Sequence, residues 1–264
     1  MTTMRRCLAS LLTLPALLTA GATALAENPR YQVTRSPEAR VEGAPAEFQA
    51  ENPANALRFD FPVTGLVGSP ERAGPNAWSF DLRLTAITFD GRFAPPGSAK
   101  LTASENRVDY DLGSARVSYV NTPQGLEQWI TIPAPATPGK PGAPTVIGLE
   151  LSVDGGLTPV RDGYFVKLVR STGEAALRYG PVRAEGADER LLDARLEPAP
   201  AAADGSISGA RVTINAIDPV YPIEVRTVLT SGALGNRPTE APAAEPVQAE
   251  MVGVPVTLQP GITV

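Results

Sequence analysis

The most regular feature of the chain is an alternation of apolar and polar residues with a period of two. Apolar side chains occupy every second position from Trp78 to Leu84, with polar side chains between them. This is the period of a β-strand with one buried face. After Ala86 the phase shifts, because Ile87 and Phe89 fall on the opposite face, which predicts a β-bulge or a strand buried on both sides. No window longer than a dozen residues has a convincing helical period.

Further strands follow at short intervals, separated by turn residues. Between residues 121 and 125 a turn is predicted, because Pro123 fixes a negative φ and Gly125 supplies a positive one. Other strands are predicted at 107–110, 115–119, 126–132, 146–153, 164–170, 174–179, 207–216 and 222–229. Residues 188–197 are compatible with a helix or a strand. Short turns favour antiparallel pairing, so the chain is predicted to be all-β, an antiparallel β-sandwich.

Proline and glycine divide the chain into segments. There are 27 prolines and 24 glycines in 264 residues, above the average but below low-complexity composition. Five prolines within 133–144 predict an extended surface loop inside a single sandwich domain, 55–231. Residues 27–54 are polar and predict a loosely ordered arm. Residues 232–249, rich in Pro, Ala and Glu, have the composition of a linker. Residues 250–264 predict a tail with one further strand.

The first 26 residues have the pattern of a secretory signal peptide. Two arginines form a basic region, Leu8–Leu18 form an apolar region, and Ala24–Ala26 form a small-x-small cleavage site. Pro15 interrupts the apolar run, which is shorter than the ~20 residues of a membrane span. We therefore expect an exported protein that is periplasmic, secreted or bound at the cell surface, with no membrane insertion after cleavage of the signal.

Composition limits the chemistry of the chain. It has no histidine, and its one cysteine, Cys7, lies in the predicted signal. A Ser-His-Asp triad, a Cys-His pair and a histidine-bearing zinc site are therefore excluded. The three lysines do not stand in a Ser-x-x-Lys motif, and no Gly-x-Ser-x-Gly motif is present. A net charge of −5 argues against nucleic acid and anionic lipid as partners. We predict a non-enzymatic protein with no catalytic residue.

Five short motifs between residues 78 and 229 resemble a segment found in another group of proteins. They are Asn106–Tyr110, Asn121–Gln128, Leu149–Leu151, Leu177–Gly180 and Val220–Val225. They resemble the β-rich segment that stands in front of FG-GAP, integrin-alpha-like repeats in bacterial secreted cell-surface proteins. FG-GAP repeats carry Asp-x-Asp-x-Asp-Gly calcium loops, and this sequence has no such spacing. The resemblance therefore implies the front module alone, without the calcium-binding propeller.

Three residues are candidates for a ligand site. Glu127 and Trp129 share one face of a predicted strand, where a carboxylate beside an aromatic ring is suited to gripping a sugar. The alternative is that Trp129 fills the core or covers an edge while Glu127 is a solvated neighbour. Glu150 is a second strand carboxylate. Two carboxylates that hydrolyse a glycosidic bond must lie about 5–10 Å apart, which the sequence does not fix.

Calcium is a further possibility at three Asp-Gly turns, which offer carboxylate and carbonyl oxygens. They are Asp154-Gly155-Gly156, Asp162-Gly163 and Asp204-Gly205. Because Asp-Gly is also an ordinary turn dipeptide, we predict no metal and no cofactor.

Three functions remain open. The first hypothesis is an exported, non-enzymatic β-sandwich module for cell-surface display, adhesion or extracellular assembly, whose partner is an extracellular protein or a glycan. The alternative is a carbohydrate-binding or carboxylate-based carbohydrate-active protein that uses Trp129, Glu127 and Glu150. The third is a secretion or assembly factor that completes another protein's sheet through Met251–Leu258. The sequence does not predict an oligomeric state.

Overall fold

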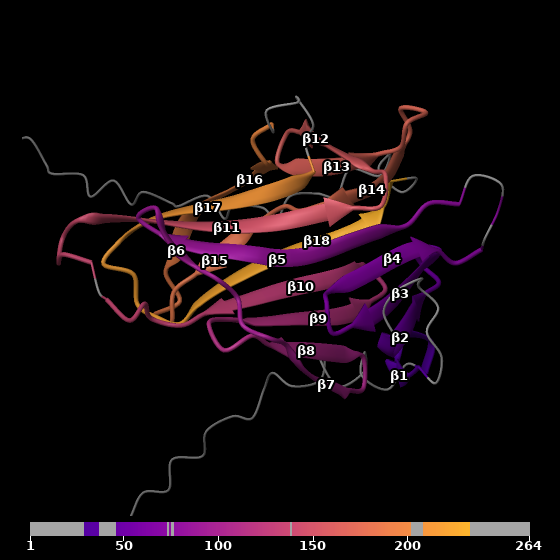
Figure 1. Ribbon diagram of the computed structural model, residues 1–264, viewed down its shortest axis with the longest axis horizontal. Coiled ribbons are helices and arrows are strands. Elements are labelled where there is room, and N and C mark those ends of the chain that lie inside the picture. Colours follow the sequence, from indigo (N-terminus) through magenta and orange to yellow (C-terminus); the bar gives the residue numbers. More distant parts are fainter. Residues whose placement is uncertain are drawn as a thin grey trace, which may run out of the picture.

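The computed structural model describes residues 29–36, 46–72, 74, 77–137, 139–201 and 208–232. Within these residues the secondary structure consists of eighteen β-strands and one 3-10 turn, η1 (Pro29–Tyr31). The strands pack as two layers that form an elongated body (Figure 1). The predicted all-β, sandwich-like fold is confirmed. In the described ranges, no helix is long and apolar enough to cross a membrane.

The first sheet has the strand order β1-β2-β3-β4-β5-β11-β17-β16, with the short β6 beside the second half of β5. Each pairing in it is antiparallel. Its strands are β1 (Thr34–Arg35), β2 (Ala46–Asn52), β3 (Leu57–Pro62), β4 (Leu66–Pro70), β5 (Phe80–Phe89), β6 (Arg92–Ala94), β11 (Pro144–Asp154), β16 (Leu191–Pro198) and β17 (Gly209–Ile217).

The second sheet has the order β7-β8-β9-β10-β18-β14-β13-β12, and β15 also pairs with β18. Its strands are β7 (Lys100–Ser104), β8 (Arg107–Asp111), β9 (Arg116–Thr122), β10 (Gly125–Ile132), β12 (Thr158–Asp162), β13 (Phe165–Val169), β14 (Ala175–Tyr179), β15 (Arg183–Glu185) and β18 (Ile223–Ser231). Strand β16 pairs first with β15 and then with β17, so it connects the two sheets along one side.

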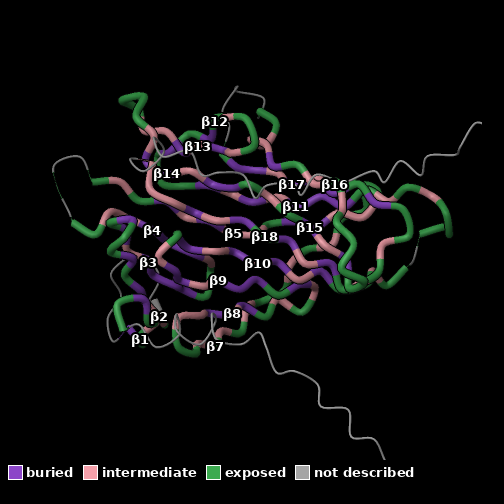
Figure 2. The backbone as a smooth tube through the Cα atoms, turned by 180° about the vertical axis from the view of Figure 1, so that it is seen from behind, coloured by how far each residue is buried: buried purple, intermediate pink, exposed green. Residues whose placement is uncertain are grey.

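The core lies between the two sheets, where the predicted alternation places the apolar side chains. In β10, Leu126, Ile130 and Ile132 are buried together with Gln128, whereas the alternate residues Glu127, Trp129 and Thr131 are partly exposed. Buried segments accordingly run through the middle strands of both layers (Figure 2). Removing such side chains from water is the main stabilising contribution in a chain that has no disulfide among its described residues.

The structure decides two local predictions, the β-bulge near Ala86 and the element formed by residues 188–197. Glu150 pairs with Ala86 while Leu151 pairs with Leu84, so Thr85 is an extra residue in β5. The predicted bulge is therefore confirmed, and it accounts for the phase shift in the sequence. The ambiguous segment 188–197 contains strand β16.

The predicted arm is more ordered than its composition indicates. Strand β2 lies in the segment 27–54 and pairs with β3 as far as Asn52 and Leu57. The sandwich therefore begins earlier than the predicted domain start at residue 55. The polar sequence of β2 concealed it, because Asn52 is held in the core by hydrogen bonds rather than by apolar packing. The predicted signal, most of the linker, and the Met251–Leu258 strand lie outside the described residues.

One end of the sandwich, which we call the closed end, is held together by buried amide side chains. Asn52 donates to the Asn121 side chain and to the Thr122 carbonyl, both at 2.8 Å. Asn121 donates to the carbonyls of Tyr31 (3.0 Å) and Glu51 (2.8 Å). Because Asn52 and Asn121 are fully buried, each of these hydrogen bonds satisfies a group that has lost its water. The network fastens the N-terminal strands to the β9–β10 hairpin.

A second buried polar group lies in the middle of the core. The Gln128 amide donates to Tyr119 Oη at 3.0 Å, and its carbonyl oxygen accepts hydrogen bonds from Tyr179 and Thr227. Burial raises the pKa of both tyrosines well above their usual range. These phenols therefore stay protonated and serve the packing of the sheet.

Candidate functional site

Trp129, the leading candidate from the sequence, lies half-buried on the outer face of the second sheet. Its indole Nε1 donates to Glu127 Oε2 at 3.0 Å. The guanidinium carbons of Arg226 and Arg107 lie 4.4 and 5.6 Å from its ring centroid, and they come from strands on opposite sides of β10. Such cation–π contacts stabilise the ring where it is. A sugar that stacked on Trp129 would have to displace an arginine.

The neighbours of Trp129 form a closed network of their own. Arg107 donates to the Ser118 hydroxyl at 2.7 Å and to Asp109 at 2.8 Å, and Ser118 donates to Asp109 at 2.5 Å. Burial raises the pKa of Asp109, but the hydrogen bonds from Arg107 and Ser118 outweigh it, so the net pKa is lowered. This carboxylate is ionised at neutral pH, and its Oδ1 is engaged by Arg107 and Ser118.

Glu150 lies on the outer face of the first sheet, where its Oε1 accepts from Arg211 Nε at 2.5 Å. Glu127 and Trp129 lie on the outer face of the other sheet, with the core between them and Glu150. The structure therefore brings Glu127 and Trp129 together and does not bring Glu150 to them. A pair of carboxylates acting on one glycosidic bond is not formed by Glu127 and Glu150, because strands of different sheets carry them.

The two described Asp-Gly turns have carboxylates that face basic side chains. Asp154 lies 2.6 Å from Arg83, and Asp162 lies 3.0 Å from Lys167 and 3.4 Å from Arg178. No group of three or more Asp, Glu or Cys residues that could hold a metal ion occurs in the part of the chain that the structure describes. Asp204-Gly205 lies outside that part. At Asp154 and Asp162, basic side chains already pair with the carboxylates that would have to bind a calcium ion.

A pocket of about 330 Å³ opens at the other end of the sandwich, which we call the loop end. Three segments far apart in the sequence form it: the β5–β6 turn, the proline-rich loop and the β17–β18 connection. The loop projects at the left in Figure 1. The lining combines rings and prolines with charged and hydroxyl side chains: Phe89, Pro135, Pro141, Pro219, Tyr221, Asp90, Arg92, Lys140, Asp218, Thr137 and Thr145.

Two aspartates hold the chain beside this pocket, Asp218 at the proline-rich loop and Asp90 at the start of β11, where the loop ends. Asp218 accepts the backbone N–H of Gly142 with both carboxylate oxygens, at 2.8 and 3.1 Å. Asp90 accepts the N–H of Val146 at 2.8 Å. Both aspartates have a positive φ, 50° at Asp90 and 46° at Asp218, a conformation that Asp tolerates better than most residues. Arg190 also donates to the Asp218 carbonyl at 2.9 Å. The loop is therefore preorganised.

Tyr221 lies in this pocket beside Asp90. Burial raises the pKa of its phenol, and the charge of Asp90 raises it further. Tyr221 is therefore a neutral hydrogen-bonding group on an otherwise apolar ring at neutral pH, a combination that suits a binding surface.

The sequence predicted the loop that forms this pocket but not the pocket. The prolines of 133–144 and the Asp90-Gly91 turn signalled surface connections, and Asp218-Pro219 is a similar signal. Their meeting depends on the pairing of β5, β11 and β17, which joins segments about 130 positions apart. No protein-family model matches the chain, and neither does any curated protein. The resemblance to the FG-GAP-associated segment stays a prediction.

Proposed function

We propose that the chain is an exported, non-enzymatic β-sandwich module that binds an extracellular partner through its loop end, in cell-surface display, adhesion or assembly. The observation that carries this proposal is the pocket of about 330 Å³ under a loop that Asp218 holds at Gly142 and Asp90 holds where the loop enters β11. Binding residues are often located on loops that a rigid scaffold positions. A sandwich with an open, preorganised end has this arrangement.

Preorganisation supports a binding function because it reduces the cost of association. A loop that must be ordered by its ligand loses conformational freedom when it binds, which weakens the complex. Here the N–H groups of Gly142 and Val146 already have carboxylate acceptors without a ligand. The pocket therefore keeps its shape before the partner arrives.

The charges of the pocket indicate the chemistry of the partner. Asp90 and Asp218 direct carboxylate oxygens to backbone N–H groups. Arg92 and Lys140 also line the pocket, and neither takes part in an ion pair within the described ranges. These two cations would attract an acidic partner locally, although the net charge of the whole protein is −5. An acidic protein segment or glycan on a cell surface is the partner that this pocket fits best.

The experiment measures the attachment of fluorescently labelled residues 27–264 to the surface of the producing bacterium. We expect saturable attachment, weakened by salt because the cations are exposed. The double variant Arg92→Glu with Lys140→Glu should attach about tenfold more weakly. Lys100→Glu is the matched control, because it reverses an exposed charge on β7, outside the pocket. Attachment that is absent in the wild type, or equal in the double variant, would contradict the proposal.

A further inference from the structure

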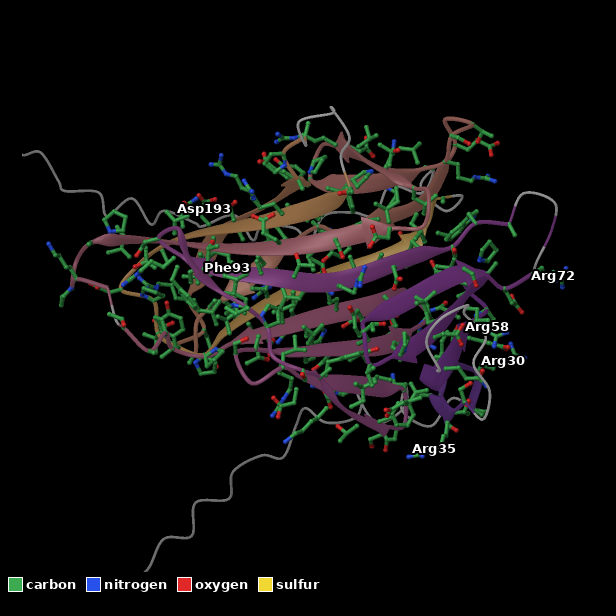
Figure 3. The ribbon with its side chains drawn as sticks, in the orientation of Figure 1. Arg30, Arg35, Arg58, Arg72, Phe93 and Asp193 are labelled. Carbon is green, nitrogen blue, oxygen red and sulfur yellow. The ribbon has the colours of Figure 1, made fainter. Side chains whose placement is uncertain are left out.

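A second cleft, of about 360 Å³, lies along the side of the sandwich where β16 connects the two sheets. It is formed by the β12–β13 hairpin, by the β14–β15 connection at Pro181 and Val182, and by β16. It shares no lining residue with the loop-end pocket. Asp193, labelled on β16 in Figure 3, contributes to its wall. The cleft is therefore a separate place where a ligand could be held.

Tyr164 is the feature of this cleft that the fold does not explain. It is 84% exposed, although it lines the cleft. It is the second residue of the two-residue turn between β12 and β13, after Gly163 with a φ of 63°. Such a turn requires the glycine, and the position after it accepts polar residues. The phenol ring is thus required neither by the turn nor by the core.

The ring of Tyr164 is open, in contrast with that of Trp129. Two arginines lie over Trp129, whereas no cation–π or ring contact involves Tyr164 within the described ranges. An exposed aromatic face is what a ligand with a flat apolar surface needs for stacking. Tyr164 therefore offers the stacking surface that the sequence had suggested for Trp129.

Each of the two arginines that line the cleft lies beside a carboxylate, of which Asp193 also lines the cleft and Glu197 does not. Arg161 lies 2.9 Å from Glu197, and Arg195 lies 3.7 Å from Asp193. A guanidinium has five N–H donors and a carboxylate about four acceptor positions, so each pair keeps free donors and acceptors. A charged ligand would be repelled by one member of each pair, whereas a neutral one with hydroxyl groups can bond to both members.

We propose that this cleft binds a neutral saccharide. One sugar ring stacks on Tyr164, and the sugar hydroxyls bond to Arg161, Arg195 and Asp193. The side chains combine one apolar ring with a few convergent polar groups, the usual composition of a small-ligand site. This inference stands independently of the loop-end proposal, because the two sites have different residues.

The test is a calorimetric titration of residues 27–264 with neutral tetrasaccharides of glucose, xylose and mannose, and with tetragalacturonate as an acidic probe. We expect at least one neutral tetrasaccharide to bind with a Kd of about 1 mM or below. Tyr164→Ala should weaken that binding about tenfold, and Tyr164→Phe should retain most of it, because the ring persists. Phe93→Ala is the matched control, since Phe93 is 63% exposed and does not line the cleft (Figure 3).

Three results would overturn the inference. They are the absence of binding by all the neutral tetrasaccharides at about 10 mM, equal binding by the wild type and Tyr164→Ala, and binding of tetragalacturonate alone. The variants change an exposed turn residue, so thermal unfolding at the wild-type temperature would show that the fold is intact. The attachment experiment with Arg92 and Lys140 does not depend on Tyr164, and the two proposals can fail separately.

Discussion

The polar groups at the two ends of the sandwich differ in burial and in the partners to which they bond. At the closed end, Asn52 and Asn121 are fully buried, and their amide groups bond to protein groups from three segments of the chain. At the loop end, Asp90 and Asp218 stand at the surface and bond to backbone N–H groups, which leaves a pocket beneath the loop. The first arrangement pairs the amide groups of both asparagines with protein groups, and the second leaves aromatic and cationic groups facing solvent.

This difference separates a structural end from the end at which we propose binding. A neutral amide network with every group paired has nothing left to offer a ligand, and it is costly to interrupt. Carboxylates that hold a loop from outside cost little to the core, and they fix the shape of a pocket. The buried polar residues therefore hold the sheets together, whereas the exposed ones shape a surface.

The largest effect is expected at the closed end, from Asn121→Ala. The change leaves the carbonyls of Tyr31 and Glu51 without their donor and removes the acceptor for Asn52. With each unsatisfied buried group costing about 1–3 kcal/mol, we expect a loss of about 3 kcal/mol in the free energy of unfolding. Urea denaturation measures it. Asn215→Ala, which removes an exposed bond to Asp193, is the control and should cost less than about 0.5 kcal/mol.

If Asn121→Ala proved as mild as its control, the closed end would not be held by its amides. The closed end would then not be the structural end of the sandwich, and the contrast with the loop end would fail.

A smaller and local effect is expected at the loop end, from Asp218→Ala. The Gly142 N–H loses both of its acceptors, so the loop opens more often while the sheets remain intact. A loss of about 1 kcal/mol in local stability corresponds to roughly fivefold faster amide hydrogen exchange at Gly142. Asp218→Asn keeps one acceptor and should be intermediate. Exchange that accelerated equally at the closed end would show that the two ends are not independent.

How far the sequence predicted these features depends on whether each one is local. The alternation in β10 correctly placed Leu126 and Ile130 on one face and Trp129 on the other, because a strand's faces follow from its own residues, but which face is buried became clear only from the structure. Strand β2 was missed, because Asn52 is buried only through partners on β9, about 70 positions away.

The candidate site shows the same limit. Glu127 and Trp129 were correctly placed together as neighbours on one strand, whereas Glu150 was grouped with them although it belongs to the other sheet. The loop-end pocket and the Tyr164 cleft each join distant segments, so no short sequence pattern announces them. The pairing of the strands determines both the pocket and the cleft, and strand pairing is a property of the whole chain.

The smallest expected effect is a gain in stability rather than a loss, and it concerns Asp81, a carboxylate near the closed end. Asp81 lies opposite Asp154, and its Oδ1 is buried with no hydrogen-bond partner in the described part of the chain. Burial raises the pKa of Asp81, Arg83 lowers it and Asp154 raises it, with a net increase above its usual value of 3.8. Because the folded pKa exceeds the unfolded one, the stability contributed below pH 3.8 is lost as the pH rises through the folded pKa.

Asp81→Asn should therefore stabilise the protein at pH 7, by about 0.5 kcal/mol for a half-buried group, and the gain should disappear at pH 3. Thermal unfolding at the two pH values measures it. A destabilised variant at pH 7 would mean that the attraction of Arg83 exceeds the costs of burial and of repulsion.

The central claim is that the protein binds with its loop end and not with its closed end. Hydrogen-exchange mass spectrometry of residues 27–264, free and attached to the surface of the producing cell, distinguishes the two ends. We expect slower exchange on attachment in residues 89–92, 139–145 and 218–221, with no change in 52–55 and 121–125. Slower exchange confined to the closed end, or attachment that slows exchange at neither end, would contradict it.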